Sequence, residues 1–534
     1  MSNQIEHVTI VGGGTDGWMT AVMLTTELNA NPSERKIEIT LVESPTVPSI
    51  GVGEATLITL PGTLEDFGIN EREFIARSNA SFKLAVRFAD WFTDSSGQRP
   101  IFYHPFNAPP NCAGRLPAYY YRKFGPPKPG MTLADSILPN VAILRGMKAP
   151  REMGAPDYDR HISYAYHLDA GLFAEYLRDL AVHRGVKHIR DDVVDVEKDE
   201  RGYVAALTLE NNGRHPVELV IDCTGFRGIV HSKVSDDSFV SFGDNLLNDR
   251  AVAVQIPHRN PKKIEPCTRA TALSGGWVWR VPLFSRLGTG YVYSSVFKSD
   301  DEARDEFLAH LRAVGDISQG TSDPETRVIK MNIGYRKKAW VKNCIAIGLS
   351  AGFVEPLEAT AIHTIEICAR WLLMNFPTKE ISPPLVQQYN ALSSSLFETI
   401  RDFVQVHYLK SNRFEPYWRA ARDDVKVSDL LSSRLDMWHN RLPEEFDTRA
   451  DSLFTNWNYI FILEPKGHFA GHEYAVDPRL SKEDWDKYCT GLERSKQNVL
   501  AVLPDHYELL SAMRGTAPDT VTPGSSMASP APPD

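Results

Sequence analysis

A glycine-rich turn near the start of the chain constrains its fold more than any other feature. The stretch reads HVTIVGGGTDGWMTA, in which Val8–Val11 predicts a short buried strand and residues 18–28 predict a helix. Between them, Gly12, Gly14 and Gly17 form the pattern G-x-G-x-x-G. Such glycines allow a sharp turn, a close approach of backbone to a pyrophosphate, and tight packing of helix on strand. The turn therefore predicts a dinucleotide site, because the free N–H groups of a helix start attract phosphate.

A second strand completes a βαβ unit after this turn. Residues 36–44 read KIEITLVES, an apolar run of the expected length and position. Glu43 lies at the end of this strand, where a carboxylate accepts hydrogen bonds from ribose hydroxyls. The ordered set favours dinucleotide binding over a glycine-rich turn that holds no ligand.

Two later elements favour FAD over NAD. Residues 221–226, IDCTGF, predict a buried strand that ends in a small-Thr-Gly turn, as in FAD proteins of the glutathione-reductase type. Residues 343–356, NCIAIGLSAGFVEP, predict an apolar strand, a small-residue turn and a helix start. Three such elements suit a long FAD molecule lying through one domain. No second G-x-G-x-x-G opens a unit for NADPH, so reduced flavin is expected from elsewhere.

Composition narrows the class of protein. The chain has 534 residues, 42% of them hydrophobic, which is enough for a large core and two closely packed domains. A net charge of −10 argues against a dedicated nucleic-acid binder. The six cysteines contain no C-x-x-C pair, so neither a disulfide framework nor a metal site is expected. No apolar run is long enough for a membrane span and no signal peptide is visible, so a cytoplasmic location is expected.

The rest of the chain divides by pattern. Residues 192–226 predict antiparallel strands with turns at 199–202 and 211–214, and residues 355–376 predict a helix. The proline-rich and aromatic residues 99–130 predict extended, rigid backbone of the kind that forms the wall of a substrate site.

Six segments in order along the chain carry a more specific signal than the glycine pattern. The most specific are a lysine near position 80, a W-x-W-x-[IV]-P strand and an E-P-L-E turn. The combination resembles the flavin-dependent tryptophan halogenase family. The segments are GGGTDGWMTA, GVGEAT (51–56), SFKLAVRFADW (81–91), WVWRVP (277–282), GTGYVYSS (288–295) and GFVEPLEATAIH (352–363).

The resemblance implies an α/β fold in which a three-layer FAD-binding domain of the glutathione-reductase or aromatic-hydroxylase type carries a mostly helical second domain. We expect the first domain, with loops of the substrate site, over residues 1–383, and the helical domain that completes the substrate pocket over residues 384–514. Residues 515–534 are rich in Pro, Ser and Ala, which predicts a disordered tail.

The resemblance also implies a reaction. In the family, FADH2 and oxygen give a flavin hydroperoxide, halide turns it into hypohalous acid, and this acid travels to a lysine beside the substrate. Lys83 matches that lysine. A buried ammonium can hydrogen-bond hypohalous acid, a free amine can form a chloramine, and burial lowers a lysine pKa. The alternatives are that Lys83 is an ordinary lysine on a strand, or that Arg87, which stays charged, is the cation.

Glu358 matches the catalytic glutamate of the family. Its implied role is to polarise the electrophile at the lysine or to take the ring proton, with Glu355 as the nearby alternative. The backbone N–H groups of Thr360 and Ala361 match a chloride site, which suits a helix start. The family more often has Ser where this chain has Ala359.

Trp277 and Trp279 match a pair that lines the tunnel and shields the flavin from organic substrate. Alternate positions on a strand place both indoles on one face, although two core tryptophans would show the same spacing. The family's paired tyrosines are Trp457 and Asn458 here, so a related indole or another electron-rich aromatic stays open beside tryptophan. The substrate residues that the resemblance implies are His104, Phe106, Glu464 and Phe469.

Asp16 departs from the family, which usually has a small Ala at this position. An acid beside a pyrophosphate is unfavourable unless it points outward or caps the helix, so modest FAD affinity is expected. The cofactor residues that the resemblance implies are Gly12, Gly14, Thr15, Gly17, Glu43, Ala55, Thr224, Gly225 and Gly348.

The sequence thus predicts an FADH2-dependent enzyme that installs chlorine or bromine on tryptophan, a related indole or another electron-rich aromatic. Its expected partners are the small aromatic substrate and a separate flavin reductase, with no nucleic acid, no membrane and no metal, and a homodimer is the expected assembly. A flavin-dependent aromatic monooxygenase is the alternative, and a non-catalytic flavin-binding protein is a weaker one.

Overall fold

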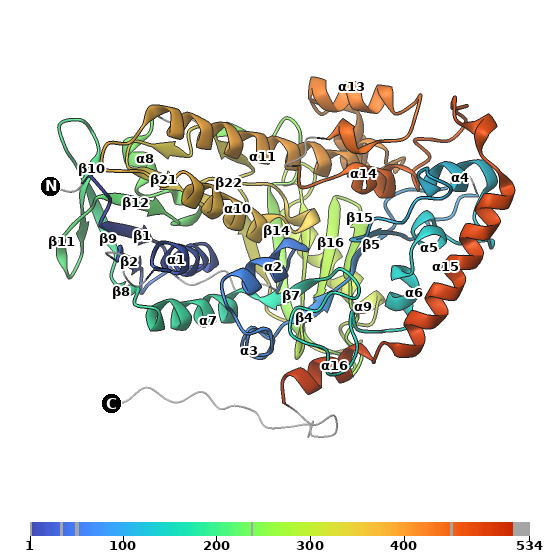
Figure 1. Cartoon of the computed structure of the whole chain (residues 1–534), viewed down its shortest axis with the longest axis horizontal. Helices are drawn as coiled ribbons and strands as arrows, with labels where there is room; N and C mark the ends of the chain where they lie inside the picture. The colour runs from blue at the N-terminus through green and yellow to red at the C-terminus, as the bar shows by residue number, and fades with distance from the viewer. Residues whose placement is uncertain are drawn as a thin grey trace.

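A six-stranded sheet contains the glycine-rich turn at its centre. In the computed structural model, which describes residues 3–31, 36–47, 53–94, 96–236, 239–448 and 452–515, β1 (His7–Val11) pairs in parallel with β2 (Glu38–Glu43) and β12 (Leu219–Asp222). β21 (Cys344–Ala346) pairs in parallel with β12. The sheet order is β20-β21-β12-β1-β2-β8, with β20 (Trp340–Val341) and β8 (Lys187–Arg190) at the edges. The three elements predicted to contact a dinucleotide therefore follow three neighbouring strands (Figure 1).

Helices cover this sheet. α1 (Thr15–Leu28) begins directly after the turn and packs against α7 (Ala170–His183) and α10 (Ala361–Met374). Its apolar side chains are buried because both the sheet and these helices surround it. The strand predicted at 8–11 and the helix predicted at 18–28 are confirmed, and the helix begins three residues earlier. Small antiparallel strands extend from the sheet: β9 (Val193–Lys198), β10 (Val204–Leu209) and β11 (Gly213–Pro216).

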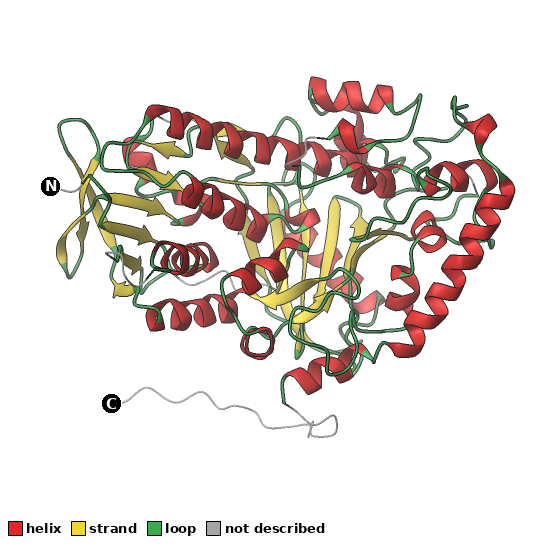
Figure 2. Ribbon diagram, in the orientation of Figure 1, coloured by secondary structure: helices red, strands yellow, loops and turns green. Residues whose placement is uncertain are grey.

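A seven-stranded sheet occupies the middle of the molecule (Figures 1 and 2). Neighbouring strands in this sheet are antiparallel, except that β15 and β5 are parallel. The helix α9 (Asp300–Ala313) packs on β14 and β17. In order, its strands are β18 (Arg327–Lys330), β14 (Arg250–Pro257), β17 (Arg286–Tyr293), β16 (Gly276–Pro282), β15 (Thr268–Leu273), β5 (Ala85–Ala89) and β6 (Phe102–Pro105).

Two three-stranded sheets lie beside these larger ones. One has the order β3-β7-β4, with β3 (Gly53–Ala55), β7 (Ala165–Asp169) and β4 (Ser81–Lys83). The other joins β13 (Phe239–Ser241), β19 (Gly334–Arg336) and β22 (Gly352–Phe353). Short helices precede β4 and follow β12: α2 (Thr59–Asp66), α3 (Glu71–Arg77) and α8 (His231–Val234).

The last third of the chain is helical, as predicted. α14 packs on α11 and β6, while α15 runs along α4 (Pro117–Phe124) and α6 (Asn140–Arg145), near α5 (Leu133–Ile137). The division at residue 384 stays a prediction. None of the described helices is long and apolar enough to cross a membrane. The helices are α11 (Pro383–Leu409), α12 (Pro416–Asp423), α13 (Asp429–Met437), α14 (Asn456–Leu463), α15 (Lys482–Val502) and α16 (His506–Met513).

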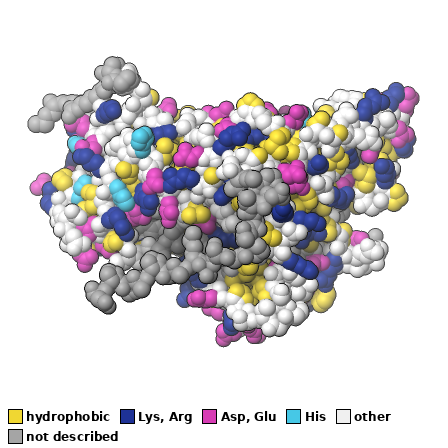
Figure 3. Space-filling model, turned by 90° about the horizontal axis from the view of Figure 1, so that it is seen from below, with side chains coloured by type: hydrophobic (Ala, Val, Ile, Leu, Met, Phe, Trp, Pro, Cys, Tyr) yellow, Lys and Arg dark blue, Asp and Glu magenta, His cyan; other side chains and the backbone are white. Residues whose placement is uncertain are grey.

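Two local expectations differ from the structure. The prediction of extended backbone over 99–130 is wrong for α4, because Pro117 lies in the first turn, where its missing N–H is not needed. The helix predicted from residue 355 begins at 361, after a 3₁₀ turn at Pro356–Glu358 and a left-handed Ala359. The predicted tail lies outside the described residues beyond Gly515. On the face seen in Figure 3, acidic and basic side chains are interspersed.

Gly17→Ala is expected to destabilise the protein, because an added Cβ would lie 1.8 Å from the Gly12 carbonyl oxygen. We expect a loss of about 1–3 kcal/mol in the free energy of unfolding, measured by urea denaturation. Gly491→Ala is the matched control, since Gly491 lies exposed in α15 with no atom within 4 Å of an added Cβ. It should gain about 0.5–1 kcal/mol from helix propensity. Equal stability of the two variants would contradict the close approach of α1 to β1.

Candidate active site

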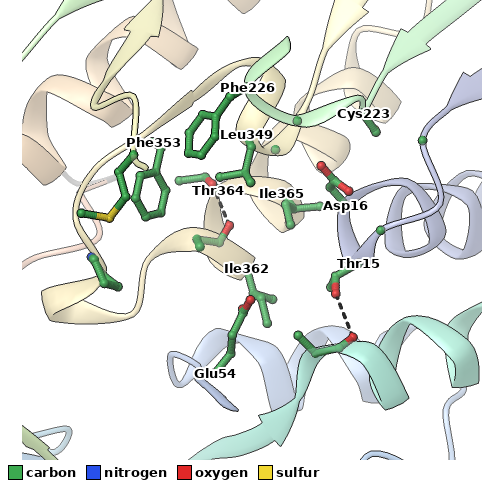
Figure 4. Close-up of a pocket in the computed structure, with 18 of the residues that line it drawn as sticks. Thr15, Asp16, Glu54, Cys223, Phe226, Leu349, Phe353, Ile362, Thr364 and Ile365 are labelled. Atoms are coloured by element: carbon green, nitrogen blue, oxygen red, sulfur yellow. Dashed lines mark hydrogen bonds between the residues drawn. The ribbon is translucent and has the colours of Figure 1, made fainter. Parts of the chain in front are cut away.

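A cavity of about 440 Å³ opens at the carboxyl ends of β1, β12 and β21. Figure 4 shows the side chains around it, with Phe226 and Phe353 from different turns facing one another. Gly17 lies beneath the turn, buried against Gly12, and does not line the cavity. The other predicted cofactor residues all line it: Gly12, Gly14, Thr15, Glu43, Ala55, Thr224, Gly225 and Gly348.

A side chain on the glycines of the first turn would clash with neighbouring atoms at the edge of the cavity. Gly12 has a φ of +118°, and a Cβ there would lie 2.2 Å from the Cys223 carbonyl oxygen. A Cβ on Gly13 would lie 2.3 Å from the Glu43 side chain. His188 Nε2 lies 2.8 Å from a Glu43 oxygen, which fixes the carboxylate at the cavity edge. Bare backbone beside a fixed carboxylate fits a pyrophosphate and a ribose, so the residues present suit FAD.

Asp16 lies inside this cradle and does not point outward. Its Oδ1 accepts a hydrogen bond from the Gly17 N–H at 3.0 Å, and a Cβ on Gly348 would lie 2.6 Å from its side chain. In Figure 4 the Asp16 carboxyl lies between the start of α1 and the turn that carries Cys223. Burial raises the pKa of Asp16 to about 7. Burial, and then the charge of Asp169, also raises the pKa of Glu54 to about 7.

Lys83 also belongs to the lining of this cavity. Trp277 and Trp279 line it with ring centroids 6.4 Å apart, and the Trp279 ring lies over Gly290, where a Cβ would clash at 2.2 Å. Lys83 is fully buried in β4, and its Nζ donates to the Thr56 carbonyl oxygen at 2.9 Å. Burial lowers the pKa of Lys83 to about 8, against the opposing charge of Glu358.

The start of α10 borders the same cavity. Ala359 adopts a left-handed conformation with a φ of +57°, and Thr360 and Ala361 follow it as lining residues. The first N–H groups of a helix have no partner within the helix. A left-handed residue followed by such N–H groups is a geometry that suits an anion.

Glu358 is nearly fully buried and lies between two histidines. His104 Nδ1 lies 3.0 Å and 3.1 Å from its two oxygens, and His407 Nε2 lies 2.7 Å from Oε1. Although burial opposes it, the interactions with His104 and then His407 hold the Glu358 pKa well below its usual range. Glu355 contacts different groups: it accepts from Tyr408 and, at 2.7 Å, from Asn248. The structure thus separates the two glutamates that the sequence left as alternatives.

Sequence reasoning missed His407 and Lys466 near Glu358, and it named Asn458 only as a departure from the family's paired tyrosines. His407 belongs to α11, Asn458 Nδ2 lies 2.8 Å from His104 Nε2, and Lys466 Nζ donates to the His407 carbonyl oxygen at 2.5 Å. Burial lowers the pKa of Lys466 to about 7. None of the three belongs to a short motif. The available signal was that Lys466 follows Glu464, a predicted substrate residue, by two positions in the sequence.

Of the remaining predicted substrate residues, Phe106 contacts Lys83, and Glu464 and Phe469 lie at the end of α14 and after it. The Phe106 ring centroid lies 5.2 Å from Lys83 Nζ. Burial raises the pKa of Glu464, at the end of α14, to about 7, and Phe469 is buried shortly after it. His104 Nδ1 faces Glu358, and its contact with a substrate stays a prediction. Within the described residues no group of three or more His, Cys, Asp or Glu side chains could hold a metal.

Comparison with known proteins gives one consistent family. The model of the tryptophan halogenase family matches residues 7–477. Tryptophan 6-halogenase ThaL of Streptomyces albogriseolus is 32% identical over 97% of this chain and 100% of its own length. Tryptophan 7-halogenase RebH of Lentzea aerocolonigenes is 33% identical over 96% and 100%. The crystal structure of a tryptophan halogenase from Shewanella frigidimarina is similar with a TM-score of 0.87 and 31% identity, over 96% of this chain and 98% of that one.

Asp16→Asn is expected to strengthen FAD binding at pH 8 and not at pH 5.5. The pKa of Asp16 is raised to about 7, so its carboxyl is neutral below that pH and repels a pyrophosphate above it. We expect roughly a tenfold gain at pH 8, which corresponds to about 1.4 kcal/mol. Quenching of flavin fluorescence in a titration measures this. Glu43→Gln, which weakens a ribose contact, should lower affinity at both pH values. An Asp16→Asn gain that is equal at both pH values would contradict the assignment.

Proposed function

Because the chain belongs to the tryptophan halogenase family, we propose that it is an FADH2-dependent enzyme that installs chlorine or bromine on tryptophan, a related indole or another electron-rich aromatic. The reaction type follows from the family. The observation that carries the proposal is one cavity whose lining includes Glu43, the glycine turns, Trp277 and the buried Lys83.

FAD is the proposed cofactor, held in a domain of the glutathione-reductase type. Glu43 binds the ribose, the turns at Gly12–Gly14 and Gly225 cradle the pyrophosphate, and Gly348 lies beside it. When bound and reduced, the flavin activates oxygen so that halide is oxidised to hypohalous acid. A separate flavin reductase supplies FADH2, since the sequence carries a single G-x-G-x-x-G unit.

The residues of this chain then control where the oxidised halogen goes. The N–H groups of Thr360 and Ala361 hold the halide at the start of α10. Trp277 and Trp279 separate the flavin end of the cavity from the organic substrate. The buried Lys83 hydrogen-bonds hypohalous acid as an ammonium or captures the halogen as an amine, and so positions an electrophile.

Glu358, whose charge acts on Lys83, acts on the same electrophile or on the ring proton. Phe106 and Phe469 supply flat apolar contact for an indole, and Glu464 accepts hydrogen bonds from the substrate ammonium. A carboxylate in a mostly apolar pocket discriminates in favour of a cationic group, because it is otherwise left without a partner.

Lys83→Met is expected to abolish halogenation. The assay contains the protein, tryptophan, FAD, a flavin reductase, NADH, oxygen and bromide, with mass spectrometry of the product. The wild type should give a product heavier by bromine minus hydrogen, and the variant should react at least about 100-fold more slowly because the electrophile is no longer positioned.

Lys496→Met is the matched control for this variant. Lys496 is also buried and donates to a backbone carbonyl, that of Asp135 at 2.6 Å, but it lies in α15 far along the chain from the cavity residues. Its activity should stay close to that of the wild type. A product heavier by oxygen and indifferent to bromide would replace the proposal by an aromatic monooxygenase, and normal bromination by Lys83→Met would sink the role of Lys83.

Glu464→Gln is expected to raise the KM for tryptophan about tenfold and to leave the KM for 3-methylindole unchanged. The loss of a charged hydrogen bond to the ammonium costs about 1.5–3 kcal/mol, and 3-methylindole has no ammonium. The pKa of Glu464 is raised to about 7, so wild-type KM for tryptophan should fall as pH rises through 7. Steady-state kinetics measure both. A similar change for both substrates would show that Glu464 does not read the ammonium.

A further inference from the structure

The hydrogen-bond partners of His104 and His407 show which of their ring nitrogens carry a hydrogen. His407 Nδ1 lies 3.0 Å from the Phe403 carbonyl oxygen, which can only accept. His407 Nδ1 therefore carries a hydrogen. Its other ring nitrogen, Nε2, faces Glu358 Oε1 at 2.7 Å.

His104 is fixed in a single neutral form. The Asn458 Oδ1 accepts from the Thr455 N–H at 2.6 Å, so the Asn458 amide nitrogen is the atom that faces His104 Nε2 at 2.8 Å. An amide N–H₂ only donates, so His104 Nε2 is bare and Nδ1 holds the hydrogen. That hydrogen is donated to Glu358.

One further proton is required between His407 and Glu358. A carboxylate and an imidazole that carries hydrogen only on Nδ1 would face each other with two lone pairs at 2.7 Å. The contact therefore holds a proton, as imidazolium with carboxylate or as imidazole with carboxylic acid. Both side chains are buried, so water does not enter the contact between them. The proton is therefore shared by His407 and Glu358.

The charge of Glu358 retains that proton against the effect of the apolar surroundings. The rings of Phe88, Trp91 and Phe403 surround the imidazole, with centroids 5.2, 6.1 and 5.2 Å away. The titratable groups that face His407 are Glu358, Lys466 and His104. Burial lowers the His407 pKa, and the hydrogen bond and charge of Glu358 oppose that effect.

We propose that His407 is a positioning residue that acts through Glu358, holding the proton that Glu358 gives to the oxygen of hypohalous acid and later recovers from the substrate ring. This inference rests on the proposed function, which supplies hypohalous acid and the aromatic substrate. The same shared proton then accounts for both roles that were considered for Glu358, which are polarising the electrophile and taking the ring proton.

The step balances in atoms and charge. The ring carbon attacks the halogen with its π electrons, the halogen–oxygen bond breaks, and the leaving oxygen takes the shared proton to become water. The pair is then neutral His407 with ionised Glu358. Glu358 next removes the proton from the halogenated ring carbon, the C–H electrons restore aromaticity, and the pair regains its starting state. The sum is aromatic C–H plus hypohalous acid to aromatic C–halogen plus water.

His407→Gln tests the proposal. Glutamine keeps an N–H donor toward Glu358 but holds no transferable proton. The single-turnover bromination rate of the FAD-loaded variant should fall about 100-fold with unchanged KM, a magnitude typical of a lost general acid–base contribution. The wild-type rate should fall at high pH as the pair loses its proton, and the variant should lack this part of the pH dependence while keeping the part that comes from Lys83. His231→Gln, at a buried histidine that contacts the Lys338 carbonyl, is the control and should brominate normally.

A second measurement needs no activity. In apoprotein labelled with ¹⁵N-histidine, the signals lost in His407→Gln identify His407, and a proton resonance of the Nε2–Glu358 contact should persist between pH 6 and 8. A wild-type rate and pH profile in His407→Gln, or a spectrum with hydrogen on Nδ1 alone and none in the contact, would overturn the proposal. Failure of the wild type to brominate any aromatic would overturn the proposed function and the chemical step with it, while the NMR count would still report on the pair.

Discussion

The parallel pairing of β1 with β12, and of β12 with β21, determines where the ligand-facing turns of this chain lie. In parallel strands the carboxyl ends meet at one edge of a sheet, so turns that are hundreds of residues apart in sequence become neighbours. The close approach is possible because Gly12 has a positive φ against the Cys223 carbonyl. The helix start that follows this turn, and the cavity above it, depend on that single register.

A second junction ties the helical part of the chain to this cavity. The Glu358 carboxylate, one turn before α10, is bonded to His104 of β6 and to His407 of α11. Lys466, in the turn after α14, donates to the same His407 backbone. A misplaced α11 would deprive this buried carboxylate of the His407 hydrogen bond, which is unfavourable. The chemistry of Glu358 therefore depends on how the last helices pack.

The sequence is informative where a residue follows a strand or lies in a motif. Gly12, Glu43, Thr224 and Gly348 could be grouped in advance because each ends a predicted strand, and all four line one cavity. The group around Glu358 could be found only in part: His104 is among the predicted substrate residues, but its bond to Glu358 and the places of His407 and Asn458 were not predicted. His407 lies in the middle of an ordinary helical pattern, and Asn458 reads as part of a helix start, where it does bond Thr455. Their meeting depends on how α11 and α14 pack on β6, and no local pattern encodes that packing.

The proton on the His407–Glu358 pair also bears on the reactivity of Lys83. Burial lowers the pKa of Lys83 to about 8, and the charge of Glu358 opposes this effect. While the pair holds its proton it is neutral overall, so it stabilises the Lys83 ammonium weakly and the amine is more accessible. Once the proton has left with the hydroxide, the pair is negative and favours the ammonium. The ammonium is the form that hydrogen-bonds the oxygen of hypohalous acid, so this sequence of charges favours that contact as the halogen–oxygen bond breaks. Lys83 and His407 are in this way coupled through the charge of one carboxylate.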